Sequence, residues 1–465
     1  MEFAGKRVTV MGLGRFGGGI GVTRWLANQG ARVVVTDQAA RDDLLESLDK
    51  LSDLDIDYKL GGHDGVDLNG CDLLVISPAV DKTKSEFVRA AVAKGIRCSS
   101  EMNLFLERCR GRPVGVTGSV GKSTTTAMIG QILSAASRSA GWTHGRVWLG
   151  GNIGKSLLDD LNTIAAEDVV VLELSSFQLE DAASLAKSPH IALVTNLREN
   201  HLDRHGTMQS YASAKANIHR FQTPDDWLIL PERGAEALPD VPAAGRRMVR
   251  FSADEATRGA RLTSMDANGR AASPEIVPMR LSIPGLHNIQ NAAGAIAVAR
   301  ILGVSDAVSA AALSEFTGLV HRLEFVREFG GVRYYNDSKA TSPEAAMTSI
   351  KAFDVPVVVL AGGSDKGGSF ESFGRFLAEH AKAVICMGET RERISASIRL
   401  GAGGCGKGPV VLPADQFESA ISSARELAKP GEVVLLSPGC ASYDWFKNYE
   451  QRGDQFRRVV MGWRD

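Results

Sequence analysis

Residues 114–124 read VGVTGSVGKST, which is a short apolar run, a glycine-rich turn and the start of a helical stretch. Gly-Lys-Ser is the core of a phosphate-binding loop, in which backbone N–H groups surround the phosphates, the lysine meets the β and γ oxygens, and the hydroxyl binds Mg²⁺. The longer pattern G-x-x-x-x-G-K-[ST] fails because Val116 takes its first glycine position, but the shorter T-G-x-x-G-K-S is intact. The stretch therefore predicts an ATP-binding α/β domain. The expected ATP contacts are Gly118, Ser119, Gly121, Lys122, Ser123 and Thr124.

Short apolar runs alternate with amphipathic stretches on both sides of this loop. The runs expected to be buried strands are residues 7–11, 32–36, 72–76, 113–116, 169–172, 191–195, 355–360, 383–387 and 432–436. Such alternation indicates βαβ units and mostly parallel sheets with helices on both faces. Residues 228–279 are the exception, because short pieces rich in Pro, Gly and charge favour a small β insertion or excursion there.

The length of 465 residues suggests about three domains. Glycine-rich turns near Gly12 and Gly118 each open an α/β unit, and a third set of strands begins after residues 316–319. We therefore predict an α/β protein of three domains. They are an N-terminal Rossmann-like domain (1–108), a central P-loop ATPase-like domain (109–317) and a C-terminal Rossmann-like domain (318–465).

The composition excludes several classes of protein. Lys plus Arg is 53 and Asp plus Glu is 54, so the formal net charge of −1 gives no basic field for gripping nucleic acid or an anionic membrane. The six cysteines form no C-x-x-C pair, which fits a reducing compartment without structural zinc. Neither a signal peptide nor a long apolar run is evident, so we expect a cytoplasmic protein.

A second glycine-rich turn, residues 12–17 (GLGRFG), follows the first expected strand. It satisfies G-x-G-x-x-G, and Asp37 ends the next strand about 20 residues further on, as in the dinucleotide fingerprint. An NAD-dependent oxidoreductase would fit this turn, but it would have no use for the Mg²⁺-ATP loop. A ligase that holds a UDP-linked substrate would use both, while close packing of helix on strand is the purely structural alternative.

Three polar residues follow the strands beside the phosphate loop. Glu173 ends the strand at 169–172, a position suited to a Mg²⁺ ligand. His201 follows the next strand, so it is expected at the same sheet edge, and Lys215 lies beyond it among small and apolar residues. By composition alone Glu173 could instead be a solvated strand end, and Lys215 an ordinary lysine that snorkels to the surface.

Further blocks occur in order at residues 150–154 (GGNIG), 172–180 (LELSSFQLE), 285–291 (GLHNIQN), 321–322 (HR), 336–341 (NDSKAT) and 435–451. With these blocks the chain resembles the Mur ligases of peptidoglycan synthesis over nearly its whole length. The run at 437–453 is the most distinctive block. Within this family, the chain is most similar to the members that join D-glutamate to UDP-N-acetylmuramoyl-L-alanine.

The resemblance implies site residues in each domain, among which Lys122, Glu173, His201 and Lys215 would be catalytic. The UDP-substrate would contact Gly12, Gly14, Gly17, Asp37, Gln38 and Asn152. Asn288, Asn291, Arg322 and Asp337 would complete the ATP site. D-glutamate would contact Lys339, Thr341, Lys366, Ser442 and Tyr449. Two Mg²⁺ ions would be held by Ser123, Glu173, His201 and a carbamylated Lys215.

The resemblance also implies a reaction in which ATP phosphorylates the alanyl carboxylate and the amine of D-glutamate attacks the acyl phosphate. Electrostatic stabilisation by Mg²⁺ and Lys122 would dominate the rate. The expected partners are UDP-N-acetylmuramoyl-L-alanine, D-glutamate and ATP, without nucleic acid or membrane, and the expected state is a monomer.

The sequence departs from the family pattern where Val120 replaces the usual Asn of the loop, Asn200 an acidic residue, and Tyr449 a Phe. The glycines of residues 18–21 also add flexibility to the UDP-binding turn. Other functions stay open as alternatives, namely another Mur ligase, a folylpolyglutamate synthase, or a nucleotide-binding protein without activity. The blocks at 336–339 and 437–453 favour addition of D-glutamate over the first two.

Overall fold

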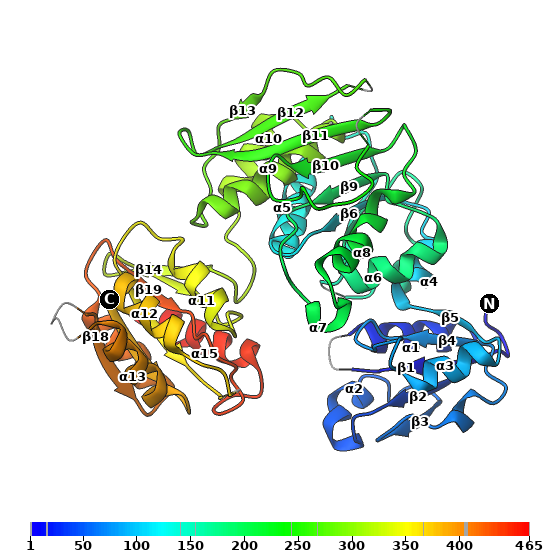
Figure 1. Cartoon of the computed structure of the whole chain (residues 1–465), viewed down its shortest axis with the longest axis horizontal. Coiled ribbons are helices and arrows are strands. Elements are labelled where there is room, and N and C mark those ends of the chain that lie inside the picture. The colour runs from blue at the N-terminus through cyan, green and yellow to red at the C-terminus, as the bar shows by residue number, and fades with distance from the viewer. Residues whose placement is uncertain are drawn as a thin grey trace. The chain divides into compact units, whose positions relative to one another are not determined.

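Figure 1 shows a computed structural model, which describes residues 2–14, 17–139, 141–153, 155–242, 244–266, 268–365, 367–403 and 408–464. The chain divides into two compact units. The first comprises Met1–Pro278 with Gln290–Ala312, and the second comprises Met279–Ile289 with Leu313–Asp465. Three sheets organise the described residues, two in the first unit and one in the second.

The first sheet has five parallel strands in the order β3-β2-β1-β4-β5. The strands are β1 (Arg7–Met11), β2 (Arg32–Asp37), β3 (Ile56–Leu60), β4 (Leu73–Ile76) and β5 (Arg97–Ser99). Its helices are α1 (Gly18–Asn28), α2 (Leu45–Asp49), α3 (Glu86–Ala93) and α4 (Glu101–Arg108). The strand order turns back between β1 and β4, which is the position where open α/β sheets generally bind ligands. The glycine-rich turn that begins at Gly12 directly follows β1, so it lies at this position.

The second sheet has eight strands in the order β13-β12-β11-β10-β9-β6-β8-β7. The parallel strands are β6 (Arg112–Thr117), β7 (Val147–Gly151), β8 (Val169–Glu173), β9 (Ile191–Val194), β10 (Trp227–Pro231) and β11 (Arg247–Asp254). The antiparallel strands β12 (Gly259–Met265) and β13 (Glu275–Val277) extend it. Its helices are α5 (Lys122–Ala136), α6 (Ser176–Ala182), α7 (Leu202–His205), α8 (Met208–Arg220), α9 (Leu286–Ile301) and α10 (Asp306–Ser314).

The third sheet, in the second unit, has the order β14-β15-β19-β16-β17-β18. Only β14 (Glu324–Phe329) is antiparallel within it; the others are β15 (Val332–Asn336), β16 (Val357–Gly362), β17 (Ala383–Met387), β18 (Val410–Ala414) and β19 (Val433–Leu436). Its helices are α11 (Pro343–Ile350), α12 (Glu371–His380), α13 (Arg391–Gly401), α14 (Phe417–Leu427) and α15 (Tyr449–Gly462).

The cores explain why these runs are strands. Along β16, Val357 and Val359 belong to one apolar cluster, while Val358 and Leu360 belong to another. Because side chains alternate across a strand, both faces of this sheet are covered, as parallel strands require. In the first unit a single apolar cluster extends from Val8 of β1 to Val170 of β8, so the first two sheets share one core.

The predicted α/β class with three domains is confirmed, and all nine expected strands are present with ends shifted by at most two residues. Residues 228–279 form β-strands, as expected of a β insertion or excursion, but these strands belong to the central sheet. Strand β10 pairs in parallel with β9, and its buried Leu228, Ile229 and Leu230 continue the central sheet. No helix in the described ranges is both long and apolar enough to cross a membrane.

His219 is an unusual buried group on α8. Its side chain is 0% exposed, and within the described part of the chain neither ring nitrogen has a hydrogen-bond partner. Burial, aided by the charge of Arg246, lowers the pKa of His219 to about 4. The folded protein therefore keeps this imidazole neutral at a pH where the unfolded chain protonates it.

His219→Leu should weaken the dependence of the unfolding free energy on pH on the acid side. The wild-type protein loses stability as pH falls from about 6.5 towards 4, because only the unfolded chain then binds the proton. Between pH 7 and 5 we expect the wild type to lose about 2 kcal/mol more unfolding free energy than the variant. Denaturant titrations at both pH values measure this difference. His380→Gln, at an exposed histidine, is the control, and it should lose as much unfolding free energy between pH 7 and 5 as the wild type does. An equal loss in His219→Leu would contradict the account.

Candidate active site

The phosphate loop connects β6 to α5 and depends on two glycines with positive φ. Gly118 has φ 145° and Gly121 has φ 87°, conformations that L side chains rarely adopt. A Cβ at Gly118 would lie 2.0 Å from Thr195 Oγ1, and one at Gly121 would lie 2.4 Å from Asn291 Oδ1. A side chain at either position would therefore be strained by the backbone conformation and would require its neighbour to move.

The tip of β9 holds this loop in shape. Thr195 Oγ1 donates to the carbonyl of Val120 at 2.6 Å, and the N–H of Val120 donates to Asn196 Oδ1 at 3.1 Å. Ser119 Oγ donates to the carbonyl of Arg198 at 2.8 Å. Because Val120 is fixed through its backbone and its side chain is 56% exposed, the loop keeps its form without the usual asparagine.

Two lysine amines converge on the same carbonyl of the loop. Lys122 Nζ and Lys215 Nζ each donate to the carbonyl of Gly118 at 2.9 Å. Lys215 is 1% exposed, and burial together with the charge of Lys122 lowers its pKa to about 6, against the opposing effect of Glu173. Lys215 is therefore a neutral amine near neutral pH, and the snorkelling interpretation is wrong because this side chain points into the protein.

Glu173 ends β8 beside the loop and is 1% exposed. Asn152 Nδ2 donates to its Oε1 at 2.9 Å. Its other oxygen, Oε2, is buried and has no hydrogen-bond partner among the residues described. A buried carboxylate oxygen without a donor suits a cation, since an unpaired buried charge is otherwise costly. The alternative of a solvated strand end is therefore wrong for Glu173.

His201 precedes α7 in a left-handed conformation, with φ 53°. Its ring lies 5.2 Å from that of Phe177. The imidazole is exposed at one edge, yet partial desolvation and the charges of Lys122 and Lys215 lower its pKa. It is therefore available as a neutral ligand.

The acidic residues around the loop are few. The described part of the chain contains no cluster of three or more His, Cys, Asp or Glu side chains with metal-binding geometry. Glu173 and His201 would therefore need further oxygen donors to hold a cation, such as Ser123 or a modified Lys215.

The first glycine turn is organised by Asp37. Its Oδ2 accepts from the N–H groups of Leu13 at 2.8 Å and Gly14 at 3.1 Å, and its Oδ1 accepts from Ala39 at 2.9 Å. A Cβ at Gly12 would lie 2.8 Å from that of Ser77. Asp37 thus holds the backbone of the turn through its carboxylate, while the side chain of the next residue, Gln38, is exposed.

The second unit places Asp337, Lys339 and Thr341 after β15, Ser442 after β19 and Tyr449 at the start of α15. Asp337 is buried and accepts from Ser437 Oγ at 2.8 Å and from the N–H of Leu323 at 3.1 Å. Burial raises its pKa to about 6. Lys339 Nζ lies 5.5 Å from the centre of the Tyr449 ring. Ser442, seven residues before Tyr449 in the sequence, is buried.

Arg322 and Thr341 are half-buried in the same unit. Lys366 lies outside the described residues. Asn288, in the second unit, donates from Nδ2 to the carbonyl of Pro284 at 2.6 Å. Asn291, in the first unit, lies against Gly121.

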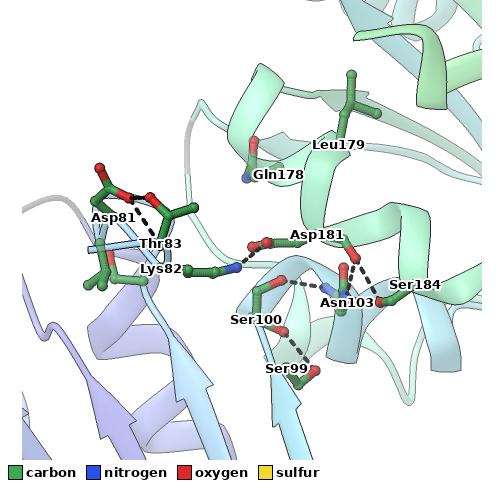
Figure 2. A network of polar contacts seen from close by, with 12 residues as sticks. Asp81, Lys82, Thr83, Ser99, Ser100, Asn103, Gln178, Leu179, Asp181 and Ser184 are labelled. Carbon is green, nitrogen blue, oxygen red and sulfur yellow. Dashed lines mark hydrogen bonds and ion pairs between the residues drawn. The ribbon is translucent and has the colours of Figure 1, made fainter. Parts of the chain in front are cut away.

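Sequence reasoning missed the polar network that joins the first two domains (Figure 2). Lys82, after β4, pairs with Asp181 on α6, and Asn103 Nδ2 donates to the carbonyl of Asp181 at 3.0 Å. Arg204 on α7 donates to the carbonyl of Ala79 at 3.1 Å. A cavity of about 280 Å³ lies here, lined by Pro78, Asp81, Lys82, Thr83, Phe177, Glu180, Asp181 and Arg204. These partners are far apart in sequence, so no local pattern reveals them.

Comparison with known proteins matches three domain families in order. Residues 6–100 match the Mur ligase MurD-like N-terminal domain, residues 116–299 the Mur ligase middle domain, and residues 321–440 the Mur ligase glutamate ligase domain. The chain is 39% identical to UDP-N-acetylmuramoylalanine–D-glutamate ligase of Symbiobacterium thermophilum, over 98% of both chains. It is 40% identical to the protein of that name from Roseiflexus sp., over 99% of both chains.

Solved structures show the same fold at low identity. UDP-N-acetylmuramate-alanine ligase MurC from Thermotoga maritima gives a TM-score of 0.58 at 20% identity, covering 98% of this chain and 99% of that one. MurF ligase from Thermotoga maritima, solved in complex with ADP, gives 0.53 at 20% identity, covering 92% and 95%.

Gly118→Ala should disrupt the phosphate loop. Its new Cβ would meet Thr195 Oγ1 at a backbone φ that alanine rarely adopts, a strain of about 1–3 kcal/mol before the clash is counted. We expect a lower Tm and loss of nucleotide binding, measured by thermal unfolding and calorimetric titration. Gly462→Ala is the control, because open space surrounds that glycine at the end of α15. Unchanged Tm and nucleotide affinity in Gly118→Ala would contradict the described loop geometry.

Proposed function

Because the chain belongs to the Mur ligase family, we propose that it joins D-glutamate to UDP-N-acetylmuramoyl-L-alanine in peptidoglycan precursor synthesis, using ATP. The observation that carries the chemistry is the convergence of Lys122, Lys215 and Glu173 on one phosphate loop. The relatives that share this chain's full length support the choice of D-glutamate. A dehydrogenase is not proposed, because the domain with the dinucleotide-like turn matches a Mur ligase domain.

We propose that ATP phosphorylates the alanyl carboxylate, because a carboxylate is a poor electrophile. A carboxylate oxygen attacks the γ-phosphorus, the bond to ADP breaks, and an acyl phosphate forms. The amine of D-glutamate then attacks the acyl carbon, loses a proton, and expels inorganic phosphate. Lys122 would exchange its bonds to the carbonyls of Gly118 and Ser119 for phosphate oxygens, which places its charge where negative charge develops.

Magnesium fits the residues beside the loop. Glu173 supplies a buried oxygen without a donor, and Ser123 and His201 supply a hydroxyl and a neutral imidazole. We propose that these residues, with Lys215, hold two Mg²⁺ ions. Bound there, Mg²⁺ neutralises phosphate oxygens during transfer.

A carbamate on Lys215 would resolve the shortage of acidic ligands. Its neutral amine can attack CO₂, forming an N–C bond and releasing a proton, which turns a neutral amine into an anionic oxygen ligand. A modified Lys215 would place a negative charge beside the amine of Lys122, since both side chains reach the carbonyl of Gly118.

We assign the substrates to the domains as follows. The boundaries are 1–108, 109–317 and 318–465, which contain the matched ranges. The UDP-substrate would contact Gly12, Gly14, Gly17, Asp37, Gln38 and Asn152. ATP would contact Gly118, Ser119, Gly121, Lys122, Ser123 and Thr124 with Asn288, Asn291, Arg322 and Asp337. D-glutamate would contact Lys339, Thr341, Lys366, Ser442 and Tyr449. One chain carries every group, so we propose a monomer acting in the cytoplasm, where ATP is supplied.

Phosphate release from ATP tests this function. It should require UDP-N-acetylmuramoyl-L-alanine and D-glutamate together, and the product should gain one glutamyl residue by mass. Release with meso-diaminopimelate or L-lysine in place of D-glutamate would contradict the substrate assignment.

Lys122→Ala should stop the first half-reaction. Without the ammonium, the amount of acyl phosphate trapped by hydroxylamine should fall about 10²–10³-fold. Binding of the UDP-substrate, measured by calorimetry, should change little because its turn lies in another domain. Unchanged trapping would rule out this role for Lys122.

Lys215→Ala should lose activity and regain part of it with short carboxylic acids. Acetate or propionate can enter the space left by the side chain and supply the missing carboxylate oxygens. Initial rates at increasing acid concentration measure the rescue, and Lys122→Ala, which needs a cation, should show none. Full activity in Lys215→Ala, or a loss that no acid restores, would count against a carbamate.

A further inference from the structure

Arg452 is a buried arginine in the first turns of α15, and its side chain is 1% exposed. Its Nε donates to Ser338 Oγ at 2.9 Å, and its Nη2 donates to the carbonyls of Ser338 at 2.9 Å and Cys440 at 3.1 Å. Its Nη1 donates to the carbonyl of Ala441 at 3.0 Å. One guanidinium therefore joins two loops to the helix that carries it.

The charge of Arg452 is not neutralised by a bonded acid. No carboxylate among the described residues forms an ion pair with it, and Asp444 acts on it only at longer range. Burial lowers its pKa to about 10, so the guanidinium remains charged at neutral pH. Burying a charge without a counter-charge is costly, and apolar residues of the same volume would often be as stable. Its retention in a core position points to a use beyond stability.

The groups that Arg452 holds are neighbours of the residues assigned to D-glutamate. Ser338 precedes Lys339, and Cys440 and Ala441 precede Ser442. Ser338 Oγ also donates to the carbonyl of Tyr449, at the start of the same helix, at 2.8 Å. The three segments that would form the amino-acid pocket are thus fixed to one another through a single planar group.

A third loop joins the same arrangement. The N–H of Ser364 donates to the carbonyl of Ala441 at 3.0 Å, and a Cβ on Gly363 would lie 3.1 Å from Arg452 Nη1. The carbonyl of Ala441 therefore accepts from both Arg452 and Ser364. A change at Arg452 would reach the loop that leads to residue 366.

We propose that Arg452 is a positioning residue for the acidic amino-acid substrate, holding the segments that carry Lys339, Ser442 and Tyr449 in the geometry that receives its two carboxylates. This inference rests on the proposed function. A planar group with fixed donor directions suits this task, whereas a lysine cannot reproduce four bonds in one plane.

The test is Arg452→Met in the full chain, with KM measured separately for each substrate. The variant should raise KM for D-glutamate at least tenfold while leaving KM for ATP and for the UDP-substrate within twofold. Acyl phosphate trapped by hydroxylamine in the absence of D-glutamate should form at the wild-type rate, because that step does not involve the pocket. Arg452→Lys should give a smaller increase in KM for D-glutamate.

Arg327→Met is the matched control. Arg327 Nη1 donates to the carbonyls of Met461 at 3.3 Å and Trp463 at 3.2 Å, at the other end of α15. Losing it removes guanidinium–carbonyl bonds from the same helix without touching the pocket, so KM for D-glutamate should stay within twofold. If both variants raise this KM equally, or if Arg452→Met raises all three KM values together, Arg452 has only a structural role.

Ser338→Ala gives a second test should Arg452→Met fail to fold. It removes the hydroxyl that links Arg452 to Tyr449 while leaving the charge in place. A selective increase in KM for D-glutamate supports the proposal, and an unchanged value overturns it. Failure of the proposed function would look different, because the wild-type protein itself would then form no acyl phosphate.

Discussion

Two lysine amines donate to one carbonyl oxygen of the phosphate loop, and the chemistry proposed for this loop depends on that arrangement. Lys122 and Lys215 both donate to Gly118 at 2.9 Å. Two ammonium ions so placed would repel each other, and burial penalises the one that water cannot reach. Lys215 therefore gives up its proton more readily, and Lys122 stands at the start of α5, where phosphate is expected. The positive φ of Gly118 and the tip of β9 hold the carbonyl where both amines reach it.

The fold could be predicted from the sequence because its strands are continuous apolar runs followed by glycine, serine or asparagine. The strands that went unpredicted lack this signal. In β7 only three apolar residues precede the glycines of VWLGG, and in β3 half-buried and exposed residues alternate, since it forms one edge of its sheet. Strand β10 was assigned to an insertion or excursion because the residues after it are polar and irregular, although its own residues are buried.

The site was predictable where chemistry sits in local motifs and unpredictable where it depends on distant partners. Glu173 and Lys122 follow strands beside a recognisable loop, so their neighbourhood could be inferred. The burial of Lys215 and the bonds between Asp37 and the backbone of the first turn require the folded chain. Arg452 lies in a block that the sequence marks as distinctive, yet its four bonds involve residues up to 114 positions away. In each unit the informative residue, Lys215 or Arg452, is a buried ionisable group. Because burying such a group lowers the stability of the fold, its position indicates a functional role.

The transfer of oxygen from substrate to phosphate tests the central claim most directly. UDP-N-acetylmuramoyl-L-alanine labelled with ¹⁸O in both alanyl carboxylate oxygens would be turned over with ATP and D-glutamate, and the inorganic phosphate analysed by mass spectrometry. If the carboxylate attacks the γ-phosphate and the amine then displaces phosphate, each phosphate released carries one ¹⁸O atom. Phosphate without the label, formed together with the glutamyl product, would show that no acyl phosphate lies on the path and would contradict this account.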